Sequence, residues 1–188
     1  LRRDTRACPQ PYLPVRLSGC SSPPTTGPIA TPALQLRRDL ELVTELDRLG
    51  YEEVWAGEHH SAGYEIIASP ELFLAAAAER TGRIRLGTGV NSLPYHQPLV
   101  LADRICQLDQ QSRGRAMLGV GPGQLASDAF MMGVDPMDSR TMMADSLEVI
   151  VRLLRGETVT AATDWFTLDE ARLQLGPYRG REMEVAVA

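Results

Sequence analysis

Three short apolar segments typical of buried strands recur at almost constant intervals along this chain. Their centres, Trp55, Leu86 and Leu118, lie 31 and 32 residues apart, and amphipathic helical patterns fill the intervals. An alternation of strands and helices at this spacing is typical of βα units, which place successive strands in parallel. The spacing therefore predicts an α/β fold with a parallel sheet.

Helix-stop and helix-start residues set the expected bounds of these elements. Apolar residues at three- and four-residue steps predict a helix that Gly50 ends, and Ser69-Pro70 predicts the start of the next helix. A further helix should follow Asp138 as its N-cap, and residues 158–175 should form an irregular excursion anchored by Trp165 and Phe166. We expect strands near 51–57, 84–90, 115–120 and 183–188, with helices at 36–49, 70–81 and 98–112 packed on one outer face.

Residues 1–32 differ in kind from the rest, because they hold seven prolines and a polar run at 18–27. We expect irregular structure there, apart from a possible short strand at 12–17. One domain, residues 33–188, should contain the sheet.

Composition narrows the class of ligand. The chain is 44% apolar and 23% charged, with a net charge of −5 and no cluster of basic residues, which argues against nucleic acid or an anionic membrane as partner. No apolar run approaches the roughly 20 residues needed to cross a bilayer. Cys8, Cys20 and Cys106 lack the spacing of a zinc site or a disulfide framework, so we expect a cytoplasmic protein with a small-molecule ligand.

The chain's three histidines follow predicted strands. Glu58-His59-His60 follows the first and His96 the second, at the strand ends where parallel α/β folds bind ligands. Because neighbours on an extended chain point to opposite sides, at most one of His59 and His60 should face the site. Equally, one of these two histidines could face solvent while hydrogen bonds within the structure satisfy the other. A metal site of Glu58 with the histidines is the least favoured alternative, since no HxH or HExxH spacing is present.

Two glycine-rich stretches end predicted strands. In Leu86-Gly-Thr-Gly-Val90 the glycines would let a flat ligand approach the backbone, with Thr88 offering a hydroxyl, or would only permit tight packing. Gly119-Val-Gly-Pro-Gly123 lacks the last glycine of the dinucleotide fingerprint, so a turn over a bound ring is as plausible as a phosphate site. The methionine pairs at 131–132 and 142–143 read as core filler.

Together these motifs resemble the bacterial luciferase-like flavin-dependent monooxygenases, within them the limonene-monooxygenase-like branch. The match runs from about residue 30 to the end. Its motifs are Gly50-Tyr-Glu-Glu-Val-Trp-Ala-Gly-Glu-His-His60, Ala68-Ser-Pro-Glu-Leu72, Ile84-Arg-Leu-Gly-Thr-Gly89, Leu93-Pro-Tyr-His-Gln-Pro98, Leu108-Asp109, Gly114-Arg115 and Leu118-Gly-Val-Gly121.

The resemblance implies a (β/α)8 TIM barrel in which reduced FMN reacts with oxygen to give a C4a-hydroperoxide that oxygenates a small organic substrate. It implies that His59 faces the flavin and acts in catalysis, and that Thr88, Gly89, Val90 and Gly121 bind the cofactor, often with a cis peptide between Gly89 and Val90. Pro122 stands where bacterial luciferase has an arginine toward the flavin phosphate, which argues against aldehyde-luciferase chemistry. A histidine that holds or relays a proton in a dry pocket suits this role.

A complete barrel takes about 250 residues, so the chain should form an incomplete barrel of about four or five parallel strands, the N-terminal fragment of such an enzyme. Flavin-phosphate contacts would then come from residues beyond it. The resemblance further implies a separate flavin reductase as partner and a homo-oligomeric full-length form. We expect no metal, because no ligand spacing is present and flavin can activate oxygen unaided. An F420-dependent oxidoreductase of the same superfamily and a non-catalytic interaction module remain the alternatives.

Overall fold

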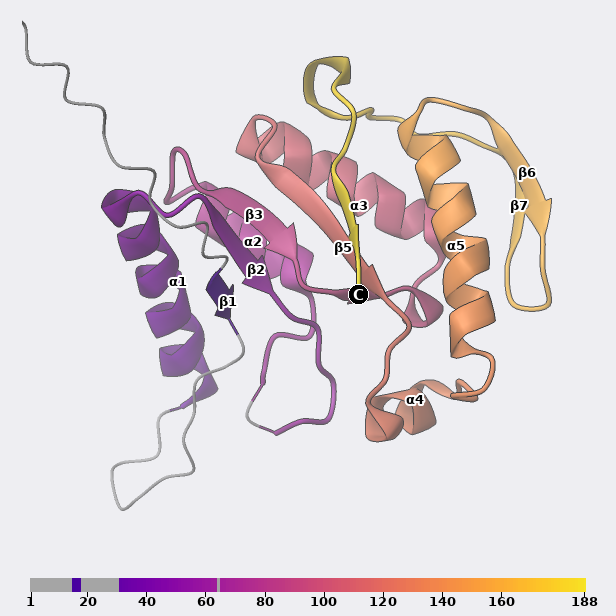
Figure 1. Ribbon diagram of the computed structural model, residues 1–188, viewed down its shortest axis with the longest axis horizontal. Coiled ribbons are helices and arrows are strands. Elements are labelled where there is room, and N and C mark those ends of the chain that lie inside the picture. Colours follow the sequence, from indigo (N-terminus) through magenta and orange to yellow (C-terminus); the bar gives the residue numbers. More distant parts are fainter. Residues whose placement is uncertain (1–14, 18–30, 64) are drawn as a thin grey trace, which may run out of the picture.

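The computed structural model describes residues 15–17, 31–63 and 65–188 of the chain. Its main feature is a six-stranded, wholly parallel sheet with the order β1-β2-β3-β5-β4, in which β8 pairs with the other edge of β5 (Figure 1). The strands are β1 Val15–Leu17, β2 Glu53–Ala56, β3 Arg85–Thr88, β4 Asn91–Ser92, β5 Ala116–Gly121 and β8 Val185–Val187. All four expected strands are present, and their parallel arrangement as part of an incomplete barrel is confirmed.

Strand β1 falls at the end of the expected segment 12–17 and pairs with β2. The remaining expectations for residues 1–30 lie outside the described residues. Strand β4 continues the line of β3 beyond the cis peptide bond between Gly89 and Val90, so both stretches pair with β5. The cis bond implied by the resemblance is therefore confirmed.

The helices are α1 Pro32–Leu49, α2 Pro70–Ala78, α3 Pro98–Ser112, α4 Ala126–Met132 and α5 Ser139–Leu154, with short 3₁₀ turns η1 Leu93–Tyr95 and η2 Tyr178–Gly180. In Figure 1, α2 and α3 lie behind the sheet, and α1 and α5 lie at its two sides. This agrees with helices on one outer face of a curved sheet.

Some helix ends differ from the expected bounds. Helix α1 begins four residues early because the Thr31 hydroxyl accepts a hydrogen bond from the Leu34 N–H at 3.3 Å and caps it. Gly50 ends α1 in the left-handed conformation, as expected, with φ +86°. Helix α2 stops at Ala78 rather than 81, and the Asp138 side chain makes no capping hydrogen bond although α5 begins directly after it.

Alternation along the strands separates an outer core from an inner face. In β2, Val54 and Ala56 belong to the buried cluster beneath α1 and α2, while Trp55 points to the other side. Leu118 and Val120 of β5 pack into a second buried cluster with α3 and α5. The outer face of the sheet and the helices thus pack through two buried apolar clusters, one beneath α1 and α2 and one with α3 and α5.

The inner face is glycine-rich because the Trp55 ring lies against it. A Cβ atom on Gly87 would lie 2.3 Å from the Trp55 ring, and a Cβ atom on Gly119 would lie 2.0 Å from the Thr88 carbonyl oxygen and 3.2 Å from that ring. Of the two interpretations of the Leu86–Val90 glycines, tight packing therefore holds for Gly87, and Gly119 on the neighbouring strand is packed as closely. The flat group that approaches them is the protein's own indole.

Two expectations about the second half are wrong. Residues 158–175 contain an antiparallel hairpin, β6 Val159–Ala162 with β7 Thr167–Ala171, rather than an irregular excursion, although Phe166 is buried at its tip as expected. Met131 and Met132 are not core filler, because they lie 58% and 40% exposed on α4.

The amino-terminal edge of the sheet is held by two residues of the family motifs. The Asp109 carboxylate accepts hydrogen bonds from the backbone N–H groups of Ala116 at 3.3 Å and Tyr178 at 2.8 Å. The Arg115 guanidinium donates to the carbonyl oxygens of Ala78 at 2.9 Å and Ile84 at 3.0 Å. These contacts give hydrogen-bond partners to backbone N–H and carbonyl groups at strand and helix ends far from the histidines. Asp109 and Arg115 therefore stabilise the fold.

Candidate functional site

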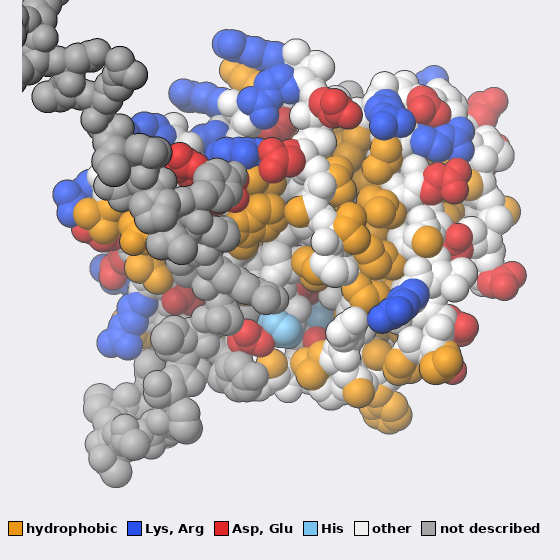
Figure 2. All heavy atoms as spheres, viewed as in Figure 1, with side chains coloured by type: hydrophobic (Ala, Val, Ile, Leu, Met, Phe, Trp, Pro, Cys, Tyr) orange, Lys and Arg blue, Asp and Glu red, His pale blue; other side chains and the backbone are white. Residues whose placement is uncertain are grey.

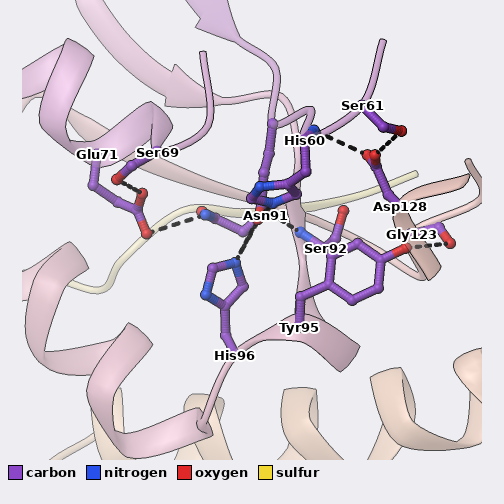
Figure 3. A network of polar contacts seen from close by, with 11 residues as sticks. His60, Ser61, Ser69, Glu71, Asn91, Ser92, Tyr95, His96, Gly123 and Asp128 are labelled. Carbon is purple, nitrogen blue, oxygen red and sulfur yellow. Dashed lines mark hydrogen bonds and ion pairs between the residues drawn. The ribbon is translucent and has the colours of Figure 1, made fainter. Parts of the chain in front are cut away.

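The candidate site lies at the carboxyl edge of the sheet, where three segments converge (Figure 3). The loop after β2 carries Glu58, His59 and His60, the segment from β4 through η1 ends at His96, and the loop after β5 leads into α4. Figure 2 shows histidine atoms visible within a recess at this edge. The expected placement of the histidine segments at one rim is confirmed.

Glu58 is the centre of the polar network. Its side chain is fully buried and accepts hydrogen bonds from His60 Nε2 at 2.8 Å, from His96 Nε2 at 2.9 Å and from the Ser92 backbone N–H at 2.8 Å. A buried carboxylate is tolerated when such donors replace its water shell. Glu58 therefore joins the loop after β2 to the β4–η1 segment.

The balance of forces on Glu58 favours its ionised form. Burial alone would raise its pKa, but the hydrogen bond and charge of His96, the Ser92 N–H and the hydrogen bond of His60 outweigh burial and hold the pKa below its ordinary value. An ionised Glu58 only accepts hydrogen bonds, so both imidazoles must present N–H groups at Nε2.

A second buried carboxylate, Asp128 of α4, holds the same loop from the other side. It accepts hydrogen bonds from the His60 backbone N–H at 3.2 Å and from the Ser61 hydroxyl. The Tyr95 ring stands edge-on to the His60 ring at 6.1 Å, and its hydroxyl donates to the Gly123 carbonyl oxygen at 3.1 Å. Burial, followed by the charges of Asp128 and Glu58, raises the Tyr95 pKa, so this phenol stays protonated.

His59 points away from this network. Its Nε2 lies 2.9 Å from Oε2 of Glu65, later in the same loop, and its backbone N–H donates to the Ile67 carbonyl oxygen at 3.1 Å. Its Nδ1 is buried and has no hydrogen-bond partner within the described part of the chain. The two neighbouring histidines are thus divided between two carboxylates, His60 on Glu58 and His59 on Glu65.

A cavity of about 250 Å³ opens beside His59. Its walls include Gly89 and Val90 after β3 and Gly121 at the end of β5. Glu58, Ser92, Tyr95, Asp128 and residues 122–125 complete most of the lining. The structure therefore brings four of the five residues expected to touch a cofactor, His59, Gly89, Val90 and Gly121, to one cavity.

The fifth residue, Thr88, lines an adjoining cavity of about 320 Å³, which also contains Trp55, Gly89 and Val90. The Thr88 hydroxyl donates to the Gly119 carbonyl oxygen and accepts from the Gly119 N–H, both at 2.9 Å. The hydroxyl therefore bridges β3 and β5 where the strand ladder is interrupted, so its hydrogen atom is already committed.

Among the described residues, no group of three or more histidine, cysteine or acidic side chains has a geometry that could hold a metal ion. The oxygens of Glu58 instead lie at hydrogen-bond distance from two imidazoles. No helix within the described ranges is long and apolar enough to cross a membrane. A larger cavity of about 740 Å³ lies by the carboxyl end of α5 and the segment before β8, at the opposite edge from the histidines.

Sequence reasoning missed three site residues. The sequence pattern gives Glu58 a site role only in the metal alternative, although its place at a strand end beside two histidines is a usable signal. Glu65 and Asp128 carry no spacing that distinguishes them from surface acids. The fold of the loop after β2 brings Glu65 to His59, and α4, after β5, brings Asp128 to Ser61.

A family model described as luciferase-like monooxygenase matches residues 16–185 of the sequence. The chain belongs to the luciferase-like monooxygenase family. Two curated relatives agree with this assignment. Limonene 1,2-monooxygenase of Rhodococcus erythropolis is 62% identical over 143 residues, which are 76% of this chain and 37% of that protein. 4-hydroxyprotoasukamycin monooxygenase of Streptomyces nodosus subsp. asukaensis is 59% identical over 158 residues, 84% of this chain and 43% of that protein.

A solved structure of the family shows the same fold. It is the oxygenating constituent of 3,6-diketocamphane monooxygenase from Pseudomonas putida, in complex with FMN, with a TM-score of 0.80 and 24% identity. The match covers 92% of this chain and 50% of that one. The luciferase-like chain described here thus spans less than half the length of the two curated relatives and half that of the solved structure.

Proposed function

We propose that this luciferase-like chain is the N-terminal part of a flavin-dependent monooxygenase that uses reduced FMN and O2 to oxygenate a small organic substrate. The observation that carries the proposal is the joint placement of His59, Gly89, Val90 and Gly121 around one cavity. Three separate segments of the chain deliver these residues to the rim where parallel α/β folds bind ligands.

The residues present fit the ring system of a flavin. Cavities of about 250 and 320 Å³ share Gly89 and Val90, and a Cβ atom on Gly121 would intrude to 2.7 Å from Val90. The buried, unpartnered Nδ1 of His59 is a polar atom that a ligand could satisfy. No lysine or arginine of the described residues lines either cavity, so cationic contacts to a phosphate must come from outside these linings.

A bound flavin would supply the activation of O2, and the chain's residues would control protons and water around it. The buried Nδ1 of His59 has no partner among the described residues, so His59 would take up or give a proton at that atom. The fully buried carboxylate of Glu58 keeps His60 and His96 fixed behind the cavity wall. The apolar side chain of Val90 and the glycines leave little polar surface to retain water.

The proposal includes a separate flavin reductase as source of reduced FMN, a cytoplasmic location and a homo-oligomeric full-length form. The reductase and the homo-oligomer follow from the family resemblance, and the cytoplasmic location follows from the cysteine pattern. For the substrate, limonene is the first compound to assay, because the relative that is 62% identical is named for it.

The test is an anaerobic titration of the longest reading frame that contains this sequence with reduced FMN and, separately, with reduced F420. We expect saturable binding of FMN and at least about tenfold weaker binding in Gly121→Ala. Gly82→Ala, where an added Cβ atom meets nothing within 4 Å, should bind like the wild type. Tighter binding of F420 than of FMN would identify the deazaflavin as the cofactor. Binding of neither would favour the non-catalytic interaction module.

A further inference from the structure

The loop after β2 contains a second carboxylate–histidine contact that the Glu58 network does not include. His59 Nε2 and Glu65 Oε2 are 2.9 Å apart, and their side chains are only 26% and 16% exposed. The loop between them is closed by the hydrogen bond from the His59 N–H to the Ile67 carbonyl oxygen at 3.1 Å, and Ile67 is anchored in the core beneath α1 and α2. The contact is therefore built into a closed loop.

We propose that Glu65 is the positioning residue of His59. A carboxylate accepts but does not donate, so Glu65 selects the His59 form that carries its proton on Nε2. In the neutral ring, the lone pair then lies on Nδ1, the atom that is buried and unpartnered within the described part of the chain. Glu65 fixes both the orientation of the ring and the nitrogen at which His59 exchanges a proton. This role rests on the proposed flavin-dependent function.

The assignment to Glu65 is specific, because the other carboxylates of the rim are already committed. Glu58 receives His60, His96 and the Ser92 N–H, and Asp128 receives the His60 N–H and the Ser61 hydroxyl. Glu71, the remaining buried acid near the rim, accepts from the Asn91 side-chain amide at 3.1 Å and the Ser69 hydroxyl at 2.9 Å. Glu65 alone of these four acids contacts His59.

The geometry of the rim also explains why one carboxylate does not serve all three histidines. His59 and His60 are consecutive, and their backbone N–H groups bond in different directions, to the Ile67 carbonyl oxygen and to the Asp128 carboxylate. The side chains therefore leave the chain on opposite sides. Loss of Glu65 should free His59 without disturbing His60 or His96.

The first arm of the test needs no cofactor. The measurement is a proton–nitrogen NMR correlation spectrum of the protein that carries this sequence, with nitrogen-labelled histidine. We expect a slowly exchanging Hε2 signal of His59, which is assigned through its loss in His59→Ala. Glu65→Ala should abolish this signal and leave the histidine signals of the Glu58 network unchanged. Those signals report that the rim is still folded. Persistence of the His59 signal in Glu65→Ala would overturn the proposal.

The second arm measures how oxygen consumption divides between oxygenated product and hydrogen peroxide, with reduced FMN and limonene or another compound that the wild type oxygenates. We expect Glu65→Ala to lower the ratio of product to peroxide about tenfold, within the range that a placed acid–base group contributes. Glu65→Gln, which keeps an acceptor oxygen, should recover part of the ratio. Glu52→Ala, an exposed glutamate beside the amino end of β2, is the matched control and should have no effect.

The double variant His59→Ala/Glu65→Ala separates the possible results. If Glu65 acts through His59, the double variant has the same ratio of product to peroxide as His59→Ala, because the effects of residues that act as a unit do not add. Additive losses, or an unchanged ratio in Glu65→Ala, would overturn the positioning role. A wild type that neither binds FMN nor oxygenates any compound tested would instead overturn the proposed function and with it this role, while the spectra would still decide the pairing.

Discussion

Replacing Glu58 with glutamine should destabilise the fold more than the loss of any other acid at the rim. Glu58 accepts three N–H groups, two of them from imidazoles, and its side chain is fully buried. Hydrogen bonds to a charged group are worth about 1.5–3 kcal/mol each, and a glutamine leaves one oxygen to accept while its NH2 group faces an imidazole N–H. Breaking a buried charged pair typically costs about 3–5 kcal/mol, and we expect that cost for Glu58→Gln.

Glu71→Gln is the matched control. Glu71 is also buried, but its donors are the neutral Asn91 amide and Ser69 hydroxyl, so its loss should cost about 1 kcal/mol. The assay is urea unfolding followed by circular dichroism at pH 7. A Glu58→Gln variant that loses no more stability than Glu71→Gln would show that the Glu58 charge does not hold the rim together.

The pH dependence of unfolding in wild type and Glu58→Gln gives a further test. Because the folded-state pKa of Glu58 is lowered, its stabilisation is fully present above the unfolded pKa of about 4.3 and is lost as the pH falls through the folded value. The stability difference between wild type and Glu58→Gln should therefore shrink below about pH 4.3. A difference that stays constant down to the acid transition would show that Glu58 is not ionised in the folded protein.

Three further experiments test the scaffold. Gly119→Ala would place a Cβ atom 2.0 Å from the Thr88 carbonyl oxygen and should cost about 3 kcal/mol in urea unfolding, whereas Gly82→Ala should be nearly neutral; equal effects would contradict the packing account. Burial raises the pKa of Cys106 to about 12, so mass spectrometry should find it unalkylated by iodoacetamide at pH 8 until urea is added. Burial would raise the pKa of Asp47, but hydrogen bonds from three backbone N–H groups outweigh burial and lower it, so the carboxylate stabilises the fold above its unfolded pKa. Asp47→Asn should lower the free energy of unfolding at pH 7 by about 1 kcal/mol, and the difference from wild type should shrink in acid. No loss of stability at pH 7 would show that these hydrogen bonds do not stabilise the fold.

The parallel sheet could be predicted from the sequence because its signals are local and repeated. Trp55, Leu86 and Leu118 stand at the same stage of successive βα units, and Gly50 is a strong local stop signal. The hairpin β6–β7 could not be predicted, because strands of four and five residues between polar turns give a weak pattern. Helix α4 has only seven residues, too few for a periodic signal.

The sequence predicts which strand ends form the candidate site, but not which carboxylate contacts which histidine. Strand ends placed His59, Gly89 and Gly121 near one another, since the carboxyl ends of parallel strands share a rim. Which carboxylate meets which histidine depends on the three-dimensional path of the loop after β2, and no sequence spacing encodes it. The role of Thr88 changed for the same reason, because its hydroxyl meets the Gly119 backbone only once β3 and β5 are paired.

We propose that His59 governs the fate of oxygen in a flavin-dependent monooxygenase. The decisive experiment uses the His59→Ala variant of the longest reading frame that contains this sequence. The measurement is the ratio of oxygenated product to hydrogen peroxide per reduced FMN oxidised, with the FMN dissociation constant measured alongside. We expect the ratio to fall while the dissociation constant stays within about tenfold, or about 1.4 kcal/mol. An unchanged ratio at unchanged FMN affinity would contradict the role of His59.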